Sequence, residues 1–367
     1  MSVFHTRPAL RWLVPTGTAL AIIGGGAAVG TFASAAEPSL PERSAAQLLV
    51  DLQTARLDGL SGTVIKRADL GLPSLPGIGG QGSAELTSLI SGTHTLRVWH
   101  AGPDKTRLAL LGTLGETDVI RNGSDVWVWD SQQNEARHST LGVGGGAVPK
   151  GRPDHLPSTP QEAAEQALAA IDPSTEVSVG RSATIAGRDA YELVLEPRDE
   201  TSLVDQIKIA IDAGEHVPLR FQIIPQGTRT PAFEIAFTQV DFERPDPAQF
   251  AFNPPPGTKV TEEPLTADKP ATSPASLERP TVVGTGWTSV LVAKVPQLAA
   301  VADADAQGGQ ADLVRSILGG LPKVSGDWGS GRLLKGKVFT ALATDDGRVL
   351  IGAVTPERLY EVAQGNR

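Results

Sequence analysis

The sequence lacks several residues that chemically active sites commonly use. Its 367 residues include no cysteine, and the six histidines stand apart at positions 5, 94, 100, 138, 155 and 216. Without cysteine, neither a disulfide nor a lipid attached to an N-terminal cysteine is possible. Zinc and iron sites need ligands at close spacings, which these histidines do not show. We therefore expect neither a metal ion nor another cofactor.

Motifs for nucleotide binding and catalysis are absent as well. Gly77, Gly79 and Gly82 have the formal spacing of a dinucleotide fingerprint, but two prolines precede them where that fingerprint needs a buried strand. The serine within Gly329–Gly331 lacks the flanking strand and the spacing of a nucleophile elbow. No motif predicts an enzyme, and a hydrolase site assembled in space from distant residues is the alternative that the sequence leaves open.

Basic residues are also scarce. There are 32 Lys and Arg against 41 Asp and Glu, which gives a net charge of −9. A protein that binds nucleic acid through its phosphates needs a basic patch, so nucleic acid is not an expected partner. Moderate acidity of this kind usually serves solubility.

The first 36 residues predict a secretory signal peptide. Arg7 and Arg11 precede an apolar run over residues 12–32, and the small residues 33–36 follow it. The run also approaches the ~20 residues that span a bilayer, so an uncleaved membrane anchor is the alternative. Cleavage after Ala36 removes both arginines and leaves 30 basic against 41 acidic residues, a net charge of −11 on an exported, extracytoplasmic protein.

Alternating apolar residues over Val204–Gly257 give the clearest prediction of structure. Ile207, Ile209 and Ile211 share one face of a strand, and the segment after the next turn alternates in the same way, which predicts an antiparallel hairpin. A third strand follows at Ala232–Gln239, and the run of prolines before Gly257 should end the pairing. Such a sheet has a strongly apolar face that a helix, a ligand or both must cover.

Further strands and two helices complete the expected first domain. Ser39 and Glu42 form a capping-box pattern ahead of one helical apolar stripe, and Thr159 and Glu162 do so ahead of a second. In the strand at Asp125–Asp130 both faces are apolar, so both should be covered. The other strands are expected over residues 60–67, 93–100, 106–111, 118–121, 176–179, 183–185 and 190–196.

Composition divides the chain into segments. A signal peptide over residues 1–36 precedes a first domain over residues 37–252, and a proline-rich linker over 253–280 follows it. Residues 281–367 read as a small α+β module with a hairpin across Asp345-Asp346-Gly347. This module is either an independent domain or a lid folded back on the first sheet.

Several short segments together resemble the LolA-like superfamily. The superfamily includes the lipoprotein carrier LolA, the receptor LolB, the mycobacterial lipid carrier LppX and the amino-terminal half of the MucB/RseB regulators. The resemblance covers the first domain and departs from the pattern in the glycine-rich insertion at residues 71–92 and in the tail. It rests on Leu60-Ser-Gly-Thr63, on Thr95–Arg107 with its strand, proline and arginine, and on Asn122–Asp130, Val217-Pro-Leu-Arg220 and Phe250–Gly257.

This resemblance implies a mainly β (α+β) fold, namely a half-open antiparallel β-barrel lidded by helices and followed here by the small α+β module. The concave face of such a barrel holds acyl chains. The candidate lining is Trp127, Trp129, Ile207, Ile209, Leu219, Phe221, Phe233, Ile235 and Phe237, with a gating loop at Leu72, Leu75 and Ile78 and a lid at Leu48, Leu49, Leu52, Ala164 and Leu168. A filled core of sheet and helix without a cavity is the alternative.

Two functions of different classes follow from these observations. The first is an exported, non-catalytic binding protein that holds a lipid or lipoprotein acyl chain, as a carrier or a sensor, through burial worth ~0.8 kcal/mol per methylene. The second is an envelope-stress regulator of the MucB/RseB type, whose partner is a membrane protein such as an anti-sigma factor. Abundant Ala, Gly, Pro and Arg beside little Lys is typical of an actinobacterial protein.

Overall fold

A computed structural model of the chain describes residues 38–72, 91–141, 173–262, 280–295 and 318–365. The signal segment and the helix expected after Thr159 lie outside this part. Across the described ranges, no helix is both long and apolar enough to cross a membrane.

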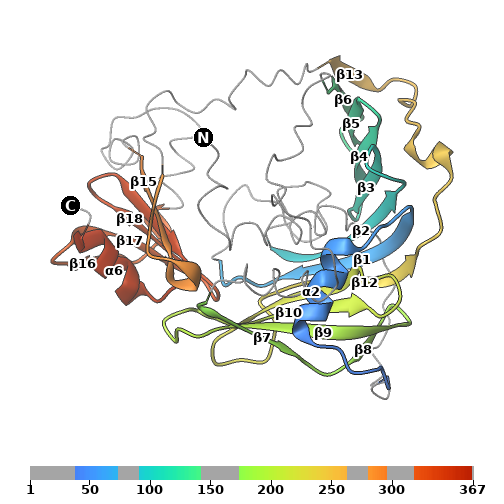
Figure 1. Cartoon of the computed structure of the whole chain (residues 1–367). Coiled ribbons are helices and arrows are strands. Elements are labelled where there is room, and N and C mark those ends of the chain that lie inside the picture. Colours follow the sequence, from blue (N-terminus) through green and yellow to red (C-terminus); the bar gives the residue numbers. More distant parts are fainter. Residues whose placement is uncertain (1–37, 73–90, 142–172, 263–279, 296–317, 366–367) are drawn as a thin grey trace, which may run out of the picture.

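Thirteen strands form the first sheet, which runs in the order β13-β6-β5-β4-β3-β2-β1-β12-β11-β10-β9-β7, with β8 also paired to β9. The path does not return to its start, so the sheet is a half-open, mainly antiparallel barrel, as the resemblance implied (Figure 1). Its strands are β1 (Leu60–Ala68), β2 (Gly92–His100), β3 (Lys105–Leu111), β4 (Glu116–Asn122), β5 (Asp125–Asp130), β6 (Glu135–Thr140), β7 (Thr175–Val179), β8 (Ala183–Ile185), β9 (Arg188–Pro197), β10 (Val204–Asp212), β11 (Pro218–Pro225), β12 (Phe233–Asp241) and β13 (Lys259–Glu262).

Most of these paired strands show the alternation of apolar and polar residues that the sequence predicted. Ile209 of β10 pairs with Phe221 of β11, which confirms the predicted hairpin. The turn at Asn122-Gly123 joins β4 to β5, and Gly123 has a φ of 66°, a conformation that glycine adopts without steric cost. Alternating side chains therefore specify the register of the sheet as well as its strands.

The N-terminal helix α2 (Ala45–Thr54) begins later than the sequence predicted. The capping box is formed by Ser44 and Gln47, not by Ser39 and Glu42: the Ser44 side chain accepts from the Gln47 amide at 3.2 Å. The hydroxyl of Tyr191 donates to the carbonyl of Pro41 at 2.9 Å, which holds the earlier segment outside the helix. Leu48 and Leu49 of α2 are buried against the sheet.

The prolines after β12 do not end the pairing, contrary to the prediction from their composition. A short 3-10 helix η3 (Pro247–Phe250) is followed by β13, which pairs in parallel with β6. Residues 253–262, assigned to a linker from sequence, therefore contribute an edge strand. We call residues 247–262 the strap, because they run along the outer side of β3–β6 (Figure 1).

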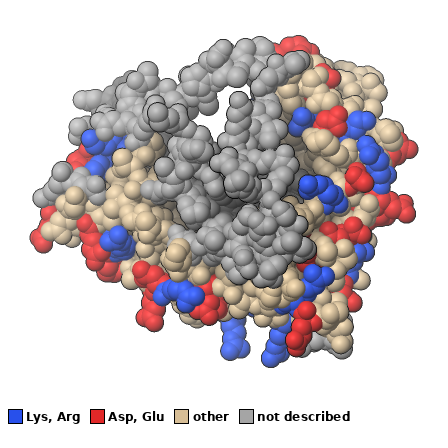
Figure 2. Space-filling view, viewed as in Figure 1, with Lys and Arg blue, Asp and Glu red and all other residues tan. Residues whose placement is uncertain are grey.

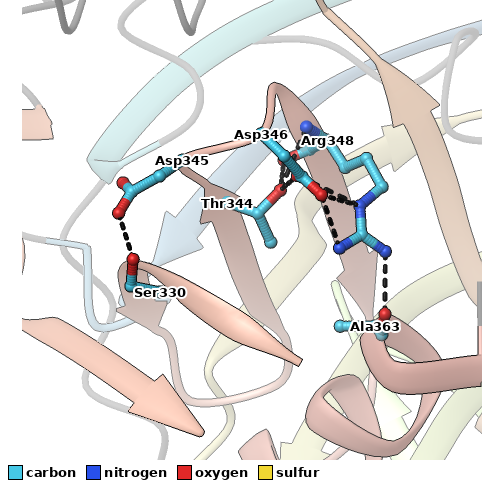
Figure 3. A network of polar contacts seen from close by, with 6 residues as sticks. All are labelled: Ser330, Thr344, Asp345, Asp346, Arg348 and Ala363. Atoms are coloured by element: carbon cyan, nitrogen blue, oxygen red, sulfur yellow. Dashed lines mark hydrogen bonds and ion pairs between the residues drawn. The ribbon is translucent and has the colours of Figure 1, made fainter. Parts of the chain in front are cut away.

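A second sheet has the order β14-β15-β19-β18-β17-β16, and α6 (Pro356–Gly365) packs on one face. The guanidinium of Arg348 is buried, pairs with Asp346 and donates to the carbonyl of Ala363 at 2.8 Å, so that it ties the β18–β19 turn to α6 (Figure 3). The strands are β14 (Thr281–Val283), β15 (Val290–Lys294), β16 (Lys323–Gly326), β17 (Gly329–Lys335), β18 (Thr340–Thr344) and β19 (Arg348–Gly352).

The second sheet contacts the end of the first sheet. The amide of Leu203 donates to the carbonyl of Ala353 at 2.9 Å, and the amide of Lys337 donates to the carbonyl of Leu70 at 2.8 Å. Val204 and Val338 are buried together in one apolar cluster between the two sheets. The second sheet therefore contacts the first sheet through backbone hydrogen bonds and this cluster, while it also has an apolar core of its own with α6.

Candidate functional site

A continuous row of side chains crosses the inner face of the first sheet. Direct cross-strand pairing places neighbouring residues of an antiparallel sheet on the same face. The pairs join six strands in succession, and α2 lies on this same side of the sheet (Figure 1). The row consists of His94, Lys66, Ile235, Phe221, Ile209 and Leu193.

A second row lies beside the first and is apolar throughout. Phe233 of β12 and Phe221 meet edge to face, with ring centroids 6.2 Å apart. At the far end of both rows, Leu48 and Leu49 of α2 pack on Leu193 and Ile209. The second row consists of Phe233, Ile223, Ile207 and Leu195.

The structure distributes the expected lining residues over three environments. Ile207, Phe221 and Phe233 are half-buried on the inner face, where a ligand could contact them. Four others are buried within apolar clusters of the protein itself: Ile209, Leu219, Ile235 and Phe237. The remaining two, both tryptophans, lie elsewhere.

Trp127 and Trp129 lie on the outer face. Their strand alternates, so Val126 and Val128 face the inner side, while both indoles contact Phe252 of the strap at centroid distances of 5.2 and 5.8 Å. This corrects their grouping with the inner-face residues, because the apolar character of both faces of β5 concealed which one faced inward. The sequence also predicted that both faces of this strand would be covered. On the outer face, Phe252 of the strap covers the two tryptophans.

The expected lid and gating loop are described in part. In α2, Leu48 and Leu49 are buried and Leu52 is half-buried over the inner face. Leu72 is half-buried just beyond β1. The other residues of these two predictions, Leu75, Ile78, Ala164 and Leu168, lie outside the described part of the chain.

His138 fastens the strap to the sheet. Its Nδ1 lies 2.8 Å from Glu262 of β13, its Nε2 lies 3.0 Å from Asp125, and its ring stacks on Trp127 at a centroid distance of 4.2 Å. Burial alone would lower the pKa of His138, but the hydrogen bonds to the two carboxylates outweigh it and raise the pKa. Because the folded pKa is raised, this stabilisation is fully present below the unfolded value near 6.5 and is lost as pH rises through the folded pKa.

Hydrogen exchange should therefore show that the strap is held more firmly at pH 5.5 than at pH 8.5. Protection factors of the β13 and β6 amides, corrected for intrinsic exchange rates, should fall as the pH rises. Glu262→Gln should reduce this dependence. Glu135→Gln, which removes the 2.6 Å pair with Lys259 in the same ladder, should lower protection without changing its pH dependence. Equal pH dependence in both variants would contradict the role of His138.

The charged residues of the described ranges do not gather into a metal-binding group or an extended patch on the face in Figure 2. No group of three or more His, Asp or Glu in those ranges could hold a metal ion. Lys, Arg, Asp and Glu are interspersed over the coloured surface in Figure 2, without an extended patch of one sign on that face. The two rows of side chains are suited to contact with an apolar ligand along the inner face. Sequence reasoning missed the two basic residues at one end of the first row, Lys66 and His94.

Comparison with known proteins found similarity in structure alone. No family model matches the chain, and no curated protein matches its sequence. The chain is similar to MucB in the complex of Pseudomonas aeruginosa MucA and MucB, with 15% identity and a TM-score of 0.43 over 87% of this chain and 96% of that one.

A LolA superfamily protein from Nitrosomonas europaea is also similar, with 12% identity and a TM-score of 0.21 over 57% of this chain and 99% of that one. An uncharacterised conserved protein from Thermus thermophilus has 12% identity and a TM-score of 0.33 over 59% and 98% of the two chains. The matched structures thus include both kinds of protein that the sequence motifs resemble. At these TM-scores, the functional argument rests on the chain's own residues.

Proposed function

We propose that this chain is an exported binding protein that holds a lipid or lipoprotein acyl chain on the inner face of its half-open barrel, without catalysis. The observation that carries the proposal is the pair of adjoining rows on that face. They present apolar side chains on β9, β10, β11 and β12 without interruption. Half-buried Phe221 and Phe233 lie on adjacent strands of this surface with their rings in contact, where an acyl chain would meet two aromatic side chains.

Burial alone supplies enough free energy for such binding. Each methylene removed from water contributes ~0.8 kcal/mol, so ten methylenes contribute about 8 kcal/mol before the cost of association. Aromatic side chains add large contact areas at low entropic cost. The proposal therefore requires neither a charged site nor a reacting group for affinity.

Binding of a fluorescent fatty-acyl probe tests the proposal. The wild-type protein should bind the probe saturably, and Phe233→Ala should weaken binding at least tenfold, because fully burying a phenylalanine is worth about 1.5–3 kcal/mol and 1.4 kcal/mol is tenfold. The matched control is Phe252→Ala, which removes the same side chain from the strap on the outer face. It should leave the affinity unchanged.

The outcomes separate clearly once both variants are shown to be folded by circular dichroism. No saturable binding by the wild-type protein would refute the proposal. Equal weakening by both substitutions would place the probe elsewhere than on the inner face.

A second candidate function is recognition of a protein, such as the extracytoplasmic part of an anti-sigma factor. The second sheet favours it, because Leu291 and Ile351 pair across β15 and β19 and each is 38% exposed, on the side away from α6. Adjacent exposed apolar residues of this kind are typical of interaction surfaces. Leu291→Ser with Ile351→Ser should then abolish capture of a partner while leaving acyl-probe binding intact. Capture that is unaffected by the double substitution would count against this surface.

A further inference from the structure

The second module lies beside the second inner-face row, which crosses β12, β11, β10 and β9. Two of its contacts with the first sheet lie near the ends of these strands. The amide of Leu203, just before β10, donates to the carbonyl of Ala353 at 2.9 Å. The indole of Trp287, in the short 3-10 helix η4 (Gly286–Thr288), donates to the hydroxyl of Thr175 at the start of β7, at 2.8 Å.

The β17–β18 turn approaches the first sheet backbone to backbone. The amide of Lys337 donates to the carbonyl of Leu70, just beyond β1, at 2.8 Å. A Cβ at Gly336 would lie 2.9 Å from that carbonyl oxygen, and a Cβ at Gly71 would lie 3.2 Å from the Lys337 amide nitrogen. Glycine on both sides therefore permits this close approach, which holds the turn against the end of β1.

An apolar cluster at this border extends onto the inner face. Val338 of the β17–β18 turn is buried in it together with two residues of the first sheet. Ile207 and Ile223 of the second row pack against this cluster, and so do Trp287 and Phe339 of the second module. These four side chains are half-buried, so each retains surface that a ligand could contact.

The chemistry of this border suits an acyl chain. The second row consists of apolar residues alone, and the second module places two aromatic side chains beside it. The charged pair at the turn, Lys337 with Asp69 at 2.5 Å, is exposed, and its two charges compensate each other. Apolar and aromatic side chains on two sides are typical of sites that bind apolar ligands.

We propose that Trp287 and Phe339 form part of the acyl-binding site, so that a chain bound on the second row lies between the first sheet and the second module. The inference rests on the proposed function and adds binding residues from the second module to it. The row spans three strand spacings, about 14 Å at ~4.8 Å each, over which a chain can contact both sheets. A ligand that contacts both also stabilises their association.

Quenching of tryptophan fluorescence by a brominated fatty acid tests the proposal, because bromine quenches only an indole close to it. The exported protein saturated with this acid should show quenching, and Trp287→Phe should remove most of it. The matched control is Trp328→Phe in the same module. Trp328 is 5% exposed and stacks on Tyr360 beside α6, with ring centroids 5.3 Å apart, so this substitution should not reduce the quenching.

Affinity and hydrogen exchange give independent readouts. Phe339→Ala should weaken binding of the same acid several-fold, because it removes apolar contact area from one side of the chain. Tyr360→Ala, which removes a half-buried aromatic side chain from the α6 side of the module, should leave the affinity unchanged. Saturating acid should raise the protection of the Leu203 and Lys337 amides, which bridge the two sheets, and should do so less in Phe339→Ala.

The proposal requires both the loss of quenching in Trp287→Phe and the loss of affinity in Phe339→Ala. If the wild-type protein binds the acid and either loss is missing, the contribution of the second module is overturned and the acyl-binding function stands. Equal losses of affinity in Phe339→Ala and Tyr360→Ala would also overturn it, because they would arise from the stability of the module. No saturable binding by the wild-type protein would refute the function itself. Melting temperatures show whether each variant is folded.

Discussion

Arg107→Met is expected to destabilise the protein by about 3–5 kcal/mol, since it leaves a buried carboxylate without its counter-ion. Asp118 of β4 is fully buried, and Arg107 of β3 donates to it at 2.5 Å. The same guanidinium lies 5.3 Å from the Trp99 ring and donates to the carbonyl of Gln249 at 3.4 Å. Arg107 therefore joins two strands to the strap, which gives a structural reason for the arginine in the family-like segment Thr95–Arg107.

The loss should depend on pH in a defined direction. Burial raises the pKa of Asp118, and Arg107 opposes that rise, so the substitution should raise it further. A carboxyl with a raised folded pKa contributes stability that is present below its unfolded pKa and is lost as pH rises through the folded value. Urea denaturation should accordingly find a smaller loss for Arg107→Met near pH 3.5 than at pH 7.

A second variant provides the control. Adding Asp118→Leu to Arg107→Met removes the uncompensated charge and should recover most of the lost stability, because replacing both partners of a buried pair by apolar residues is often neutral. A double variant as unstable as the single one would show that the cost arises from packing, not from the charge.

Asp212→Ala is expected to cost about 3 kcal/mol, at the lower end of the range for a broken buried pair because Arg188 remains partly solvated. Asp212 is fully buried at the end of β10 and accepts from Arg188 Nε at 2.5 Å and Nη2 at 3.0 Å. It also accepts from the amides of Gly214 and Glu215. One carboxylate thus closes the β10–β11 turn and ties it to β9.

The pH dependence here has the opposite sign. Burial alone would raise the pKa of Asp212, but the hydrogen bonds from Arg188 and the two amides outweigh it and lower the pKa. The stabilisation is therefore present above the unfolded pKa of about 3.9 and is lost as pH falls through the folded value. Denaturation at pH 7 should show the full difference in free energy of unfolding between wild type and Asp212→Ala. This difference should become smaller at acid pH. Asp189→Ala, on the exposed side of β9, should change stability by under about 0.5 kcal/mol.

Alternation predicted most of the first sheet because each strand buries one face. Ile207, Ile209 and Ile211 lie on β10 (Val204–Asp212), and this strand pairs with β11 in the hairpin that their alternation predicted. The start of α2 was wrong since Ser39–Glu42 and Ser44–Gln47 are equivalent as capping patterns. Tertiary contacts distinguish them, among them the hydrogen bond from Tyr191 to the carbonyl of Pro41.

The missed elements are those whose strand character comes from their neighbours. β6 and β13 contain few large apolar residues, and β13 follows three prolines, so neither has a local signal. Both strands make tertiary contacts that no periodicity reveals, namely the Trp127–His138 stack and the bond from His138 to Glu262. The sequence also could not assign Trp127 to the outer face, because both faces of β5 are apolar.

The basic end of the inner row was also beyond sequence reasoning. Within β1, Lys66 and Arg67 look like two ordinary charged neighbours, and only the register shows that one faces inward beside His94 while the other pairs with Glu234. At the same end of the inner row, Leu70 and Val338 share an apolar cluster, so the second sheet contacts the first sheet there.

Native mass spectrometry of the exported protein, purified from its own host and followed by organic extraction, tests the central claim most directly. The acyl-binding account predicts an additional mass that is lost on extraction and recovered as a lipid with an acyl chain. A clean mass of the polypeptide alone, with no uptake of added acyl chains, would contradict it and would indicate that the protein's own side chains fill the inner face.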